Sequence, residues 1–181
     1  MSTSHNEPVT KITYSDYLLF PSDGMRHEII HGRHYMNPAP SPRHQTVSRR
    51  IQFQLYEQIE KAGLGEVFDA PIDLLLSDTD VVQPDLVIVL RENDIVTPTM
   101  IQGIPELVVE ILSPSNSSYD RELKKRLYEQ HGIPEYWIVD HERQAVDQNR
   151  LENQQYTTTV QTDEIKFDPC DATVNLKEVW K

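Results

Sequence analysis

The stretch that decides the fold is residues 105–139, PELVVEILSPSNSSYDRELKKRLYEQHGIPEYWIV. Apolar runs over 106–112 and 136–139 have the length and continuity of buried strands. Between them, the charged segment over about 120–130 predicts a helix, and Gly132 ends it. A strand, a helix and a strand in this order form a βαβ unit, whose two strands lie parallel in one sheet.

Further elements are predicted upstream of this unit. Residues 27–30 and 33–36 flank His31-Gly32, a two-residue link that is typical of a tight hairpin. Ser41-Pro42 suits the start of a long helix, and Gly63 and Gly65 suit its end. The remaining predicted elements are a short helix from Thr13 to Phe20, a strand over 66–76, a turn over 78–80 and a buried strand over 86–90.

These elements predict an α/β fold with a mixed β-sheet. A chain of 181 residues is long enough to bury a core as a single domain over 1–181. Within it, we expect a flexible tail over 1–11, a core over 12–150 and short C-terminal strands over 151–181.

The charge is strongly negative and unevenly distributed. The formal net charge of −12 argues against binding nucleic acid through a broadly positive surface. Eight acids and one base lie between Glu66 and Asp94, whereas bases gather at 43–50 and 121–126. This pattern suits a metal site that handles an anion, and chance clustering on a solvated surface is the alternative.

The sequence also favours a particular compartment. No apolar run is long enough to span a membrane, and the N-terminus has no apolar signal segment. Cys170 is the only cysteine, so no disulfide can form within the chain. We therefore expect a cytoplasmic protein without a membrane partner.

Three carboxylates lie in sequence contexts that predict burial. Asp85 opens a strand, Glu110 lies within the apolar run 108–112, and Glu28 precedes two isoleucines. A buried carboxylate is costly unless it is paired, protonated or bound to a metal. The ordinary alternatives are a turn acid for Asp85, a strand glutamate in a salt bridge for Glu110 and a plain hairpin residue for Glu28.

Lys124 is the candidate cation, and its ordinary alternative is a surface lysine that pairs with Asp120 one helical turn away. Lys125 is rotated by about 100° on the helix and is predicted to face solvent. His44 and Gln83 are candidate accessory residues near a metal or a phosphate, with ordinary hydrogen bonding as the alternative. The histidines show no zinc-ligand spacing.

Five motifs follow one another along the chain: His27-Glu-Ile-Ile-His-Gly32, Ser41-Pro-Arg-His44, Val82-Gln-Pro-Asp-Leu86, Pro105-Glu-Leu-Val-Val-Glu-Ile-Leu-Ser-Pro114 and Gly132-Ile-Pro-Glu-Tyr-Trp-Ile-Val-Asp140. In this order they resemble the Uma-type "putative restriction endonuclease" family, a branch of the PD-(D/E)XK nuclease superfamily. The resemblance covers residues 12–150, and the last two motifs are its most specific part.

The resemblance implies a restriction-endonuclease-like core, a mixed β-sheet flanked by helices, with Mg²⁺ or Mn²⁺ as cofactor. Asp85 matches the aspartate of the PD motif, Glu110 the second acid and Glu28 a third glutamate, so these three are the implied metal ligands. Lys124 matches the catalytic lysine. In the superfamily this lysine normally stands two residues after the second acid, where the chain has Leu112.

The leading hypothesis is therefore a Mg²⁺-dependent endonuclease that hydrolyses phosphodiester bonds in DNA. Carboxylates can hold a divalent metal, and a nearby lysine can offset charge that develops on the phosphate. One alternative is a catalytically inactive nuclease-fold protein that binds nucleic acid or regulates a partner, and another is a small-molecule hydrolase or binding domain. A homodimer is expected by analogy with restriction enzymes, and the candidate phosphate contacts are Arg43, Arg49, Arg50 and Arg121.

Overall fold

The computed structural model describes residues 10–113 and 120–181. Most of the predicted flexible tail, residues 1–9, lies outside the described residues. Within the described part, no helix is both long enough and apolar enough to cross a membrane.

A six-stranded mixed sheet forms the centre of the fold, in the order β11-β10-β9-β8-β6-β3. Only the central pair β8 and β9 is parallel, and the other neighbours are antiparallel. The parallel pair confirms the predicted βαβ unit. The strands are β3 (Gly65–Asp69), β6 (Leu86–Leu90), β8 (Leu107–Ile111), β9 (Glu135–Asp140), β10 (Ala145–Glu152) and β11 (Gln155–Gln161).

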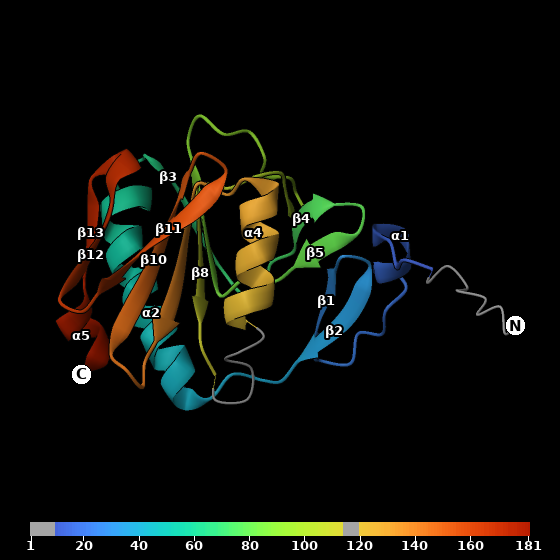
Figure 1. Cartoon of the computed structure of the whole chain (residues 1–181), viewed down its shortest axis with the longest axis horizontal. Coiled ribbons are helices and arrows are strands. Elements are labelled where there is room, and N and C mark those ends of the chain that lie inside the picture. Colours follow the sequence, from blue (N-terminus) through green and yellow to red (C-terminus); the bar gives the residue numbers. More distant parts are fainter. Residues whose placement is uncertain (1–9, 114–119) are drawn as a thin grey trace, which may run out of the picture.

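Helices cover both faces of this sheet (Figure 1). Helix α2 (Pro42–Leu55) begins after Ser41, whose hydroxyl accepts a hydrogen bond from the His44 amide, and continues into a π-helical turn, η1 (Tyr56–Glu60). On the other face lie η2 (Asp120–Lys124) and α4 (Lys125–His131), which ends at Gly132 as predicted. Because side chains alternate along a strand, Val109 packs with the α2 side and Val108 with the α4 side.

A second, five-stranded sheet has the order β2-β1-β5-β4-β7. The predicted hairpin is confirmed, because Ile30 pairs with Arg33 around His31 and Gly32, which both have positive φ. The strands are β1 (Arg26–Ile30), β2 (Arg33–Asn37), β4 (Leu74–Ser77), β5 (Asp80–Val82) and β7 (Ile101–Gln102). The predicted N-terminal helix is shorter than expected and is α1 (Tyr14–Tyr17).

Two regions differ from the sequence prediction. The run 66–76 is not one strand but two, β3 and β4, which belong to different sheets. Pro71 lies between them, and because proline lacks an N–H and restricts the residue before it, the first strand ends there.

The C-terminal segment contains a helix that the sequence reading did not predict. It follows a hairpin and is capped by Asn175, whose side chain accepts a hydrogen bond from the Lys177 amide. The elements are β12 (Glu164–Phe167), η3 (Asp168–Cys170), β13 (Ala172–Asn175) and α5 (Leu176–Trp180).

Asp80 joins three separate elements. Its carboxylate accepts hydrogen bonds from the His31 amide at 2.7 Å and the Ser77 hydroxyl at 2.6 Å, and lies 3.2 Å from His131 Nε2 at the end of α4. Burial raises the pKa of Asp80, but the contacts with His131, Ser77 and the His31 amide outweigh it and hold the pKa well below its ordinary value. The ionised carboxylate therefore stabilises this junction.

We predict that Asp80→Asn lowers the free energy of unfolding at pH 7 by roughly 1–3 kcal/mol, as for loss of a charge-assisted hydrogen bond. A carboxylate whose folded-state pKa is depressed stabilises the fold above its unfolded-state pKa, about 4. That contribution is lost as the pH falls through the folded-state pKa. Urea unfolding should show the difference between variant and parent shrinking from pH 7 to pH 3, whereas the exposed neighbour variant Asp78→Asn changes little. A pH-independent difference would contradict the ionic account.

Candidate active site

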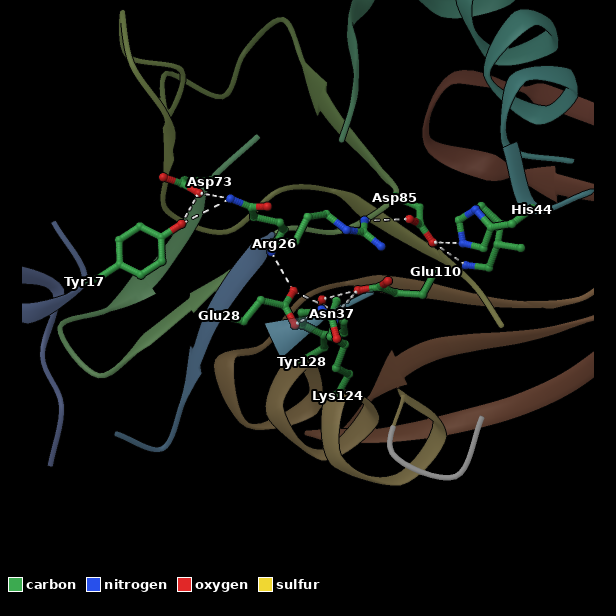
Figure 2. A network of polar contacts seen from close by, with 12 residues as sticks. Tyr17, Arg26, Glu28, Asn37, His44, Asp73, Asp85, Glu110, Lys124 and Tyr128 are labelled. Carbon is green, nitrogen blue, oxygen red and sulfur yellow. Dashed lines mark hydrogen bonds and ion pairs between the residues drawn. The ribbon is translucent and has the colours of Figure 1, made fainter. Parts of the chain in front are cut away.

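Three carboxylates are buried where the two sheets and α4 meet. Glu28 comes from β1, Asp85 directly precedes β6, and Glu110 lies near the end of β8. Their exposed fractions are 0%, 5% and 4%, respectively. Figure 2 shows that polar side chains from these elements converge on them. The structure thus brings together the three acids that the sequence singled out.

Asp85 is held by one contact from each of three elements. Its Oδ1 accepts a hydrogen bond from Arg26 Nη1 at 3.1 Å, and its Oδ2 accepts one from the Ile111 amide at 2.8 Å. His44 Nε2 lies 3.0 Å from the same Oδ2. His44 is placed there by the capped first turn of α2.

The environment of Asp85 favours the ionised form. Burial raises the pKa of Asp85, but the His44 hydrogen bond and charge, the Arg26 guanidinium and the Ile111 amide together hold it below its ordinary value. Asp85 is therefore a carboxylate at neutral pH, although it is almost completely buried.

Glu28 uses both of its oxygens within the protein. Oε1 accepts hydrogen bonds from the Gln83 amide at 2.7 Å and from Lys124 Nζ at 3.0 Å, and Oε2 accepts one from Asn37 Nδ2 at 2.7 Å. Gln83 therefore contacts the site through its backbone. Its side chain turns to Asp73 and Tyr17 instead.

Glu110 is contacted by two residues of the following helical segment. Its Oε1 accepts hydrogen bonds from Lys124 Nζ at 2.7 Å and from the Tyr128 hydroxyl at 2.9 Å. Lys124 and Tyr128 are four residues apart, so both side chains reach the same point from one helical face. Burial, then the charges of Glu110 and Glu28, raise the pKa of Tyr128 well above its ordinary value, so its hydroxyl stays a hydrogen-bond donor.

One buried cation, Lys124, and one half-buried cation, Arg26, compensate most of the negative charge. Lys124 is 2% exposed and pairs with both glutamates, and Arg26 pairs with Asp85. Burial lowers the pKa of Arg26, but Asp85, Glu110 and Glu28 outweigh it and raise that pKa above its ordinary value. Three carboxylates against two fixed cations leave the cluster with one negative charge when His44 is neutral.

Two other positions bear on the assignment of Lys124 as the cation, Leu112 and Lys125. Leu112 packs in the core on the α4 side, so no cation stands two residues after Glu110. The Lys125 ammonium lies at the exposed surface, as predicted, where its Nζ donates to the Thr158 hydroxyl at 2.8 Å. Among the described residues, Lys125 makes no hydrogen bond or ion pair with the acids, whereas its neighbour Lys124 pairs with two of them.

Two of the arginines that were candidate phosphate contacts are used for structure. Arg43 donates to the Trp180 carbonyl at 2.9 Å, and Arg50 donates to the Val179 carbonyl at 3.0 Å. They attach α5 to α2, because the last carbonyls of a helix have no partner within it.

Three residues of the site were missed by sequence reasoning: Arg26, Asn37 and Tyr128. Signals for two of them were present. Arg26 and Glu28 alternate on one face of β1, and Tyr128 follows Lys124 by one helical turn. Asn37 pairs with Arg26 across the hairpin, which only the strand register reveals.

The donor chemistry of the site fits a divalent cation. Asp85 and Glu110 lie at neighbouring strand ends, because Leu86 pairs with Val109 and the Ile111 amide donates to Asp85 at 2.8 Å. In the described part of the chain, no group of three or more histidine, cysteine, aspartate or glutamate side chains is arranged to hold a metal. Mg²⁺ does not need such a group, because it keeps several waters and is bound by one or two carboxylates together with substrate phosphate. Asp85 and Glu110 can supply these oxygens.

Comparisons with known proteins agree with this architecture. A family model described as "Uma2: Putative restriction endonuclease" matches residues 14–176. A crystal structure of "a putative nuclease belonging to DUF820" from Anabaena variabilis superposes with a TM-score of 0.79 at 19% sequence identity, covering 93% of this chain and 97% of that chain. This likeness shows a shared fold. No curated protein is significantly similar in sequence.

We predict that Lys124→Met destabilises the fold by roughly 3–5 kcal/mol, because it leaves two buried carboxylates without their cation. A surface lysine could be replaced at little cost, but Lys124 is only 2% exposed. Urea unfolding at pH 7 measures the loss. The adjacent Lys125→Met should cost less than about 0.5 kcal/mol.

A second substitution separates charge from packing. Glu110→Gln in the Lys124→Met background removes one of the uncompensated charges and should restore part of the lost stability. If Lys124→Met and Lys125→Met destabilise equally, the buried ion pairs do not contribute as described.

Proposed function

Because the chain belongs to the Uma2 family, described as putative restriction endonucleases, we propose that it is a divalent-metal-dependent nuclease that hydrolyses phosphodiester bonds in DNA. The observation that carries the proposal is the buried cluster of Asp85, Glu110 and Lys124, in which the amide that follows Glu110 donates to Asp85 at 2.8 Å and the Lys124 ammonium lies 2.7 Å from Glu110. A structural core rarely contains such a set, since buried charges are costly.

Asp85 and Glu110 would hold the metal. When bound, Mg²⁺ supplies a Lewis acid that polarises a phosphate oxygen. The depressed pKa of Asp85 supports this role, because only the ionised carboxylate is a good ligand at neutral pH. His44 and the Ile111 amide fix the direction of that carboxylate from two sides.

Lys124 would stabilise the negative charge that develops on the phosphate during hydrolysis. Preorganised charge of this kind acts strongly where water is excluded, and the Lys124 side chain is nearly completely buried. Glu28 positions the ammonium by accepting one of its hydrogen bonds, while Asn37 and the Gln83 amide hold Glu28 in place. We assign Glu28 this positioning role ahead of metal ligation, because it is the most deeply buried of the three acids, with an exposed fraction of 0%, and is enclosed by Lys124, Asn37 and the Gln83 amide.

The position of the lysine has a simple physical account. Leu112 occupies the usual position of the lysine and is part of the apolar core. The cation instead comes from the helical segment after β8, where Lys124 reaches back to Glu110. The same charge therefore reaches the second acid from a different element.

The second candidate is a catalytically inactive nucleic-acid-binding module of the same fold. One observation favours it: Arg26 and Lys124 already compensate two of the three carboxylates, so the cluster has less need of a metal than three bare acids would. The two candidates differ in whether the protein cleaves DNA.

We predict cleavage of plasmid or single-stranded DNA with Mg²⁺ or Mn²⁺, and none with EDTA. Glu110→Gln keeps the shape of the side chain but removes the ligand charge, and should lower the rate by about a hundredfold or more. The matched control is Glu106→Gln. Glu106 directly precedes the same strand, β8, but its carboxylate accepts hydrogen bonds from the Leu90 amide and from Asn93, away from the cluster. No cleavage by the parent protein with any metal would favour the inactive module.

We also predict that Mn²⁺ stabilises the folded protein. Linkage gives about 2.7 kcal/mol at a metal concentration a hundredfold above the dissociation constant, which appears as a higher thermal midpoint. Asp85→Asn should lose most of this shift, whereas Asp94→Asn at an exposed loop acid should keep it. Equal shifts in both variants would place the metal elsewhere.

A further inference from the structure

A cavity of about 520 Å³ opens beside the acidic cluster. Arg26, His44 and Asp85 form one end of it. Its walls are the segment after β2, the segment around Ala70 and Pro71, and one face of α2. This volume is within the range of pockets that bind small organic ligands.

The α2 face that lines the cavity is polar. Gln45, Ser48, Arg49 and Gln52 have the spacing i, i+3, i+4 and i+7, which places them on one side of the helix. Val47 and Ile51, by contrast, are buried against the sheet. The helix thus presents an amide, hydroxyl and guanidinium face to the cavity.

The two polar flanks of the α2–η1 helical segment differ in their partners. On the flank that faces the C-terminal segment, Arg43, Arg50, Gln54 and Gln58 donate to backbone carbonyls of residues 173–180. Among the described residues, no protein hydrogen bond or ion pair involves the side chains of Gln45, Ser48, Arg49 or Gln52. Their hydrogen-bonding groups are therefore available to a ligand.

The end of the cavity near the acids offers a positive charge as well. The Nε atom of Arg26 is buried and has no hydrogen-bond partner within the described part of the chain. Its Nη1 is bound to Asp85. Because this Nε atom has no exposed surface, a phosphate in the cavity would be attracted by the charge of the Arg26 guanidinium as a whole, and arginine is well suited to phosphate.

The rest of the cavity matches the parts of a nucleoside. Ala39, Pro40, Ala70 and Pro71 provide apolar surface for the face of a base. Glutamine and serine side chains can hydrogen-bond to base edges. A base that is paired within a duplex cannot enter a cavity of this size, whereas an unpaired one can.

We propose that this cavity binds one unpaired nucleotide next to the phosphate that is cleaved, so that the protein prefers single-stranded DNA or a strand with an extruded base over an intact duplex. The inference rests on the proposed nuclease function and adds the form of its substrate.

The test measures binding without metal. Fluorescence anisotropy with a labelled single-stranded oligonucleotide and with the duplex of the same sequence, in EDTA and at one salt concentration, gives both dissociation constants. We expect the parent protein to bind the single strand at least tenfold more tightly. Ser48→Trp fills the cavity and should weaken single-strand binding by about tenfold or more. Glu57→Trp places the same bulk on an exposed part of η1 and should leave binding unchanged.

Gln52→Ala serves as a second variant because it adds no bulk, and it should weaken single-strand binding severalfold. Equal or tighter duplex binding by the parent protein, or unchanged binding in a folded Ser48→Trp or Gln52→Ala protein, would overturn the inference. Because EDTA prevents cleavage, these results stand even if the protein cleaves nothing. Conversely, metal-dependent cleavage of duplex and single strand at equal rates, unaffected by Ser48→Trp, would support the nuclease and refute the cavity assignment.

Discussion

The burial of three carboxylates is the constraint on which the rest of this structure depends. Glu28 comes from the five-stranded sheet, and Asp85 and Glu110 come from the six-stranded sheet. A buried acid without a partner would shift its pKa or unfold the region. Arg26 and Lys124 prevent this, and because each bridges different elements, they also join the two sheets to the α4 side of the fold.

The same contacts serve stability and the proposed chemistry. A cation that neutralises Glu110 in the folded protein is already desolvated and positioned to act on a phosphate nearby. Asp85 is kept ionised by groups that also fix its orientation. In the proposed reaction, little reorganisation of the site would be needed when a substrate binds. Loss of either cation would destabilise the fold, because it leaves a buried acid without its partner.

Helix α2 has two polar flanks with different surroundings. One flank, with the following turn, binds the carbonyls of the C-terminal segment, and this explains why Arg43 and Arg50 are not free for phosphate. The opposite flank lines the cavity beside Asp85. His44 lies in the first turn of α2 and contacts Asp85 directly.

The sequence by itself determined the βαβ unit, the hairpin and the long helix, because apolar periodicity and turn residues are local signals. Charged residues within or beside apolar runs singled out Glu28, Asp85 and Glu110, and the role of Lys124 came from the resemblance to a known family. Only the tertiary structure decided the ion pairs. Arg26 meets Asp85 across 59 residues and Lys124 meets Glu28 across 96, so no local pattern connects them. Pro71 marks the break within 66–76 locally, but the assignment of β3 and β4 to different sheets and the docking of α5 were hidden for the same reason. A strand's partner depends on how distant segments pack, and its own side-chain pattern records only that it is buried.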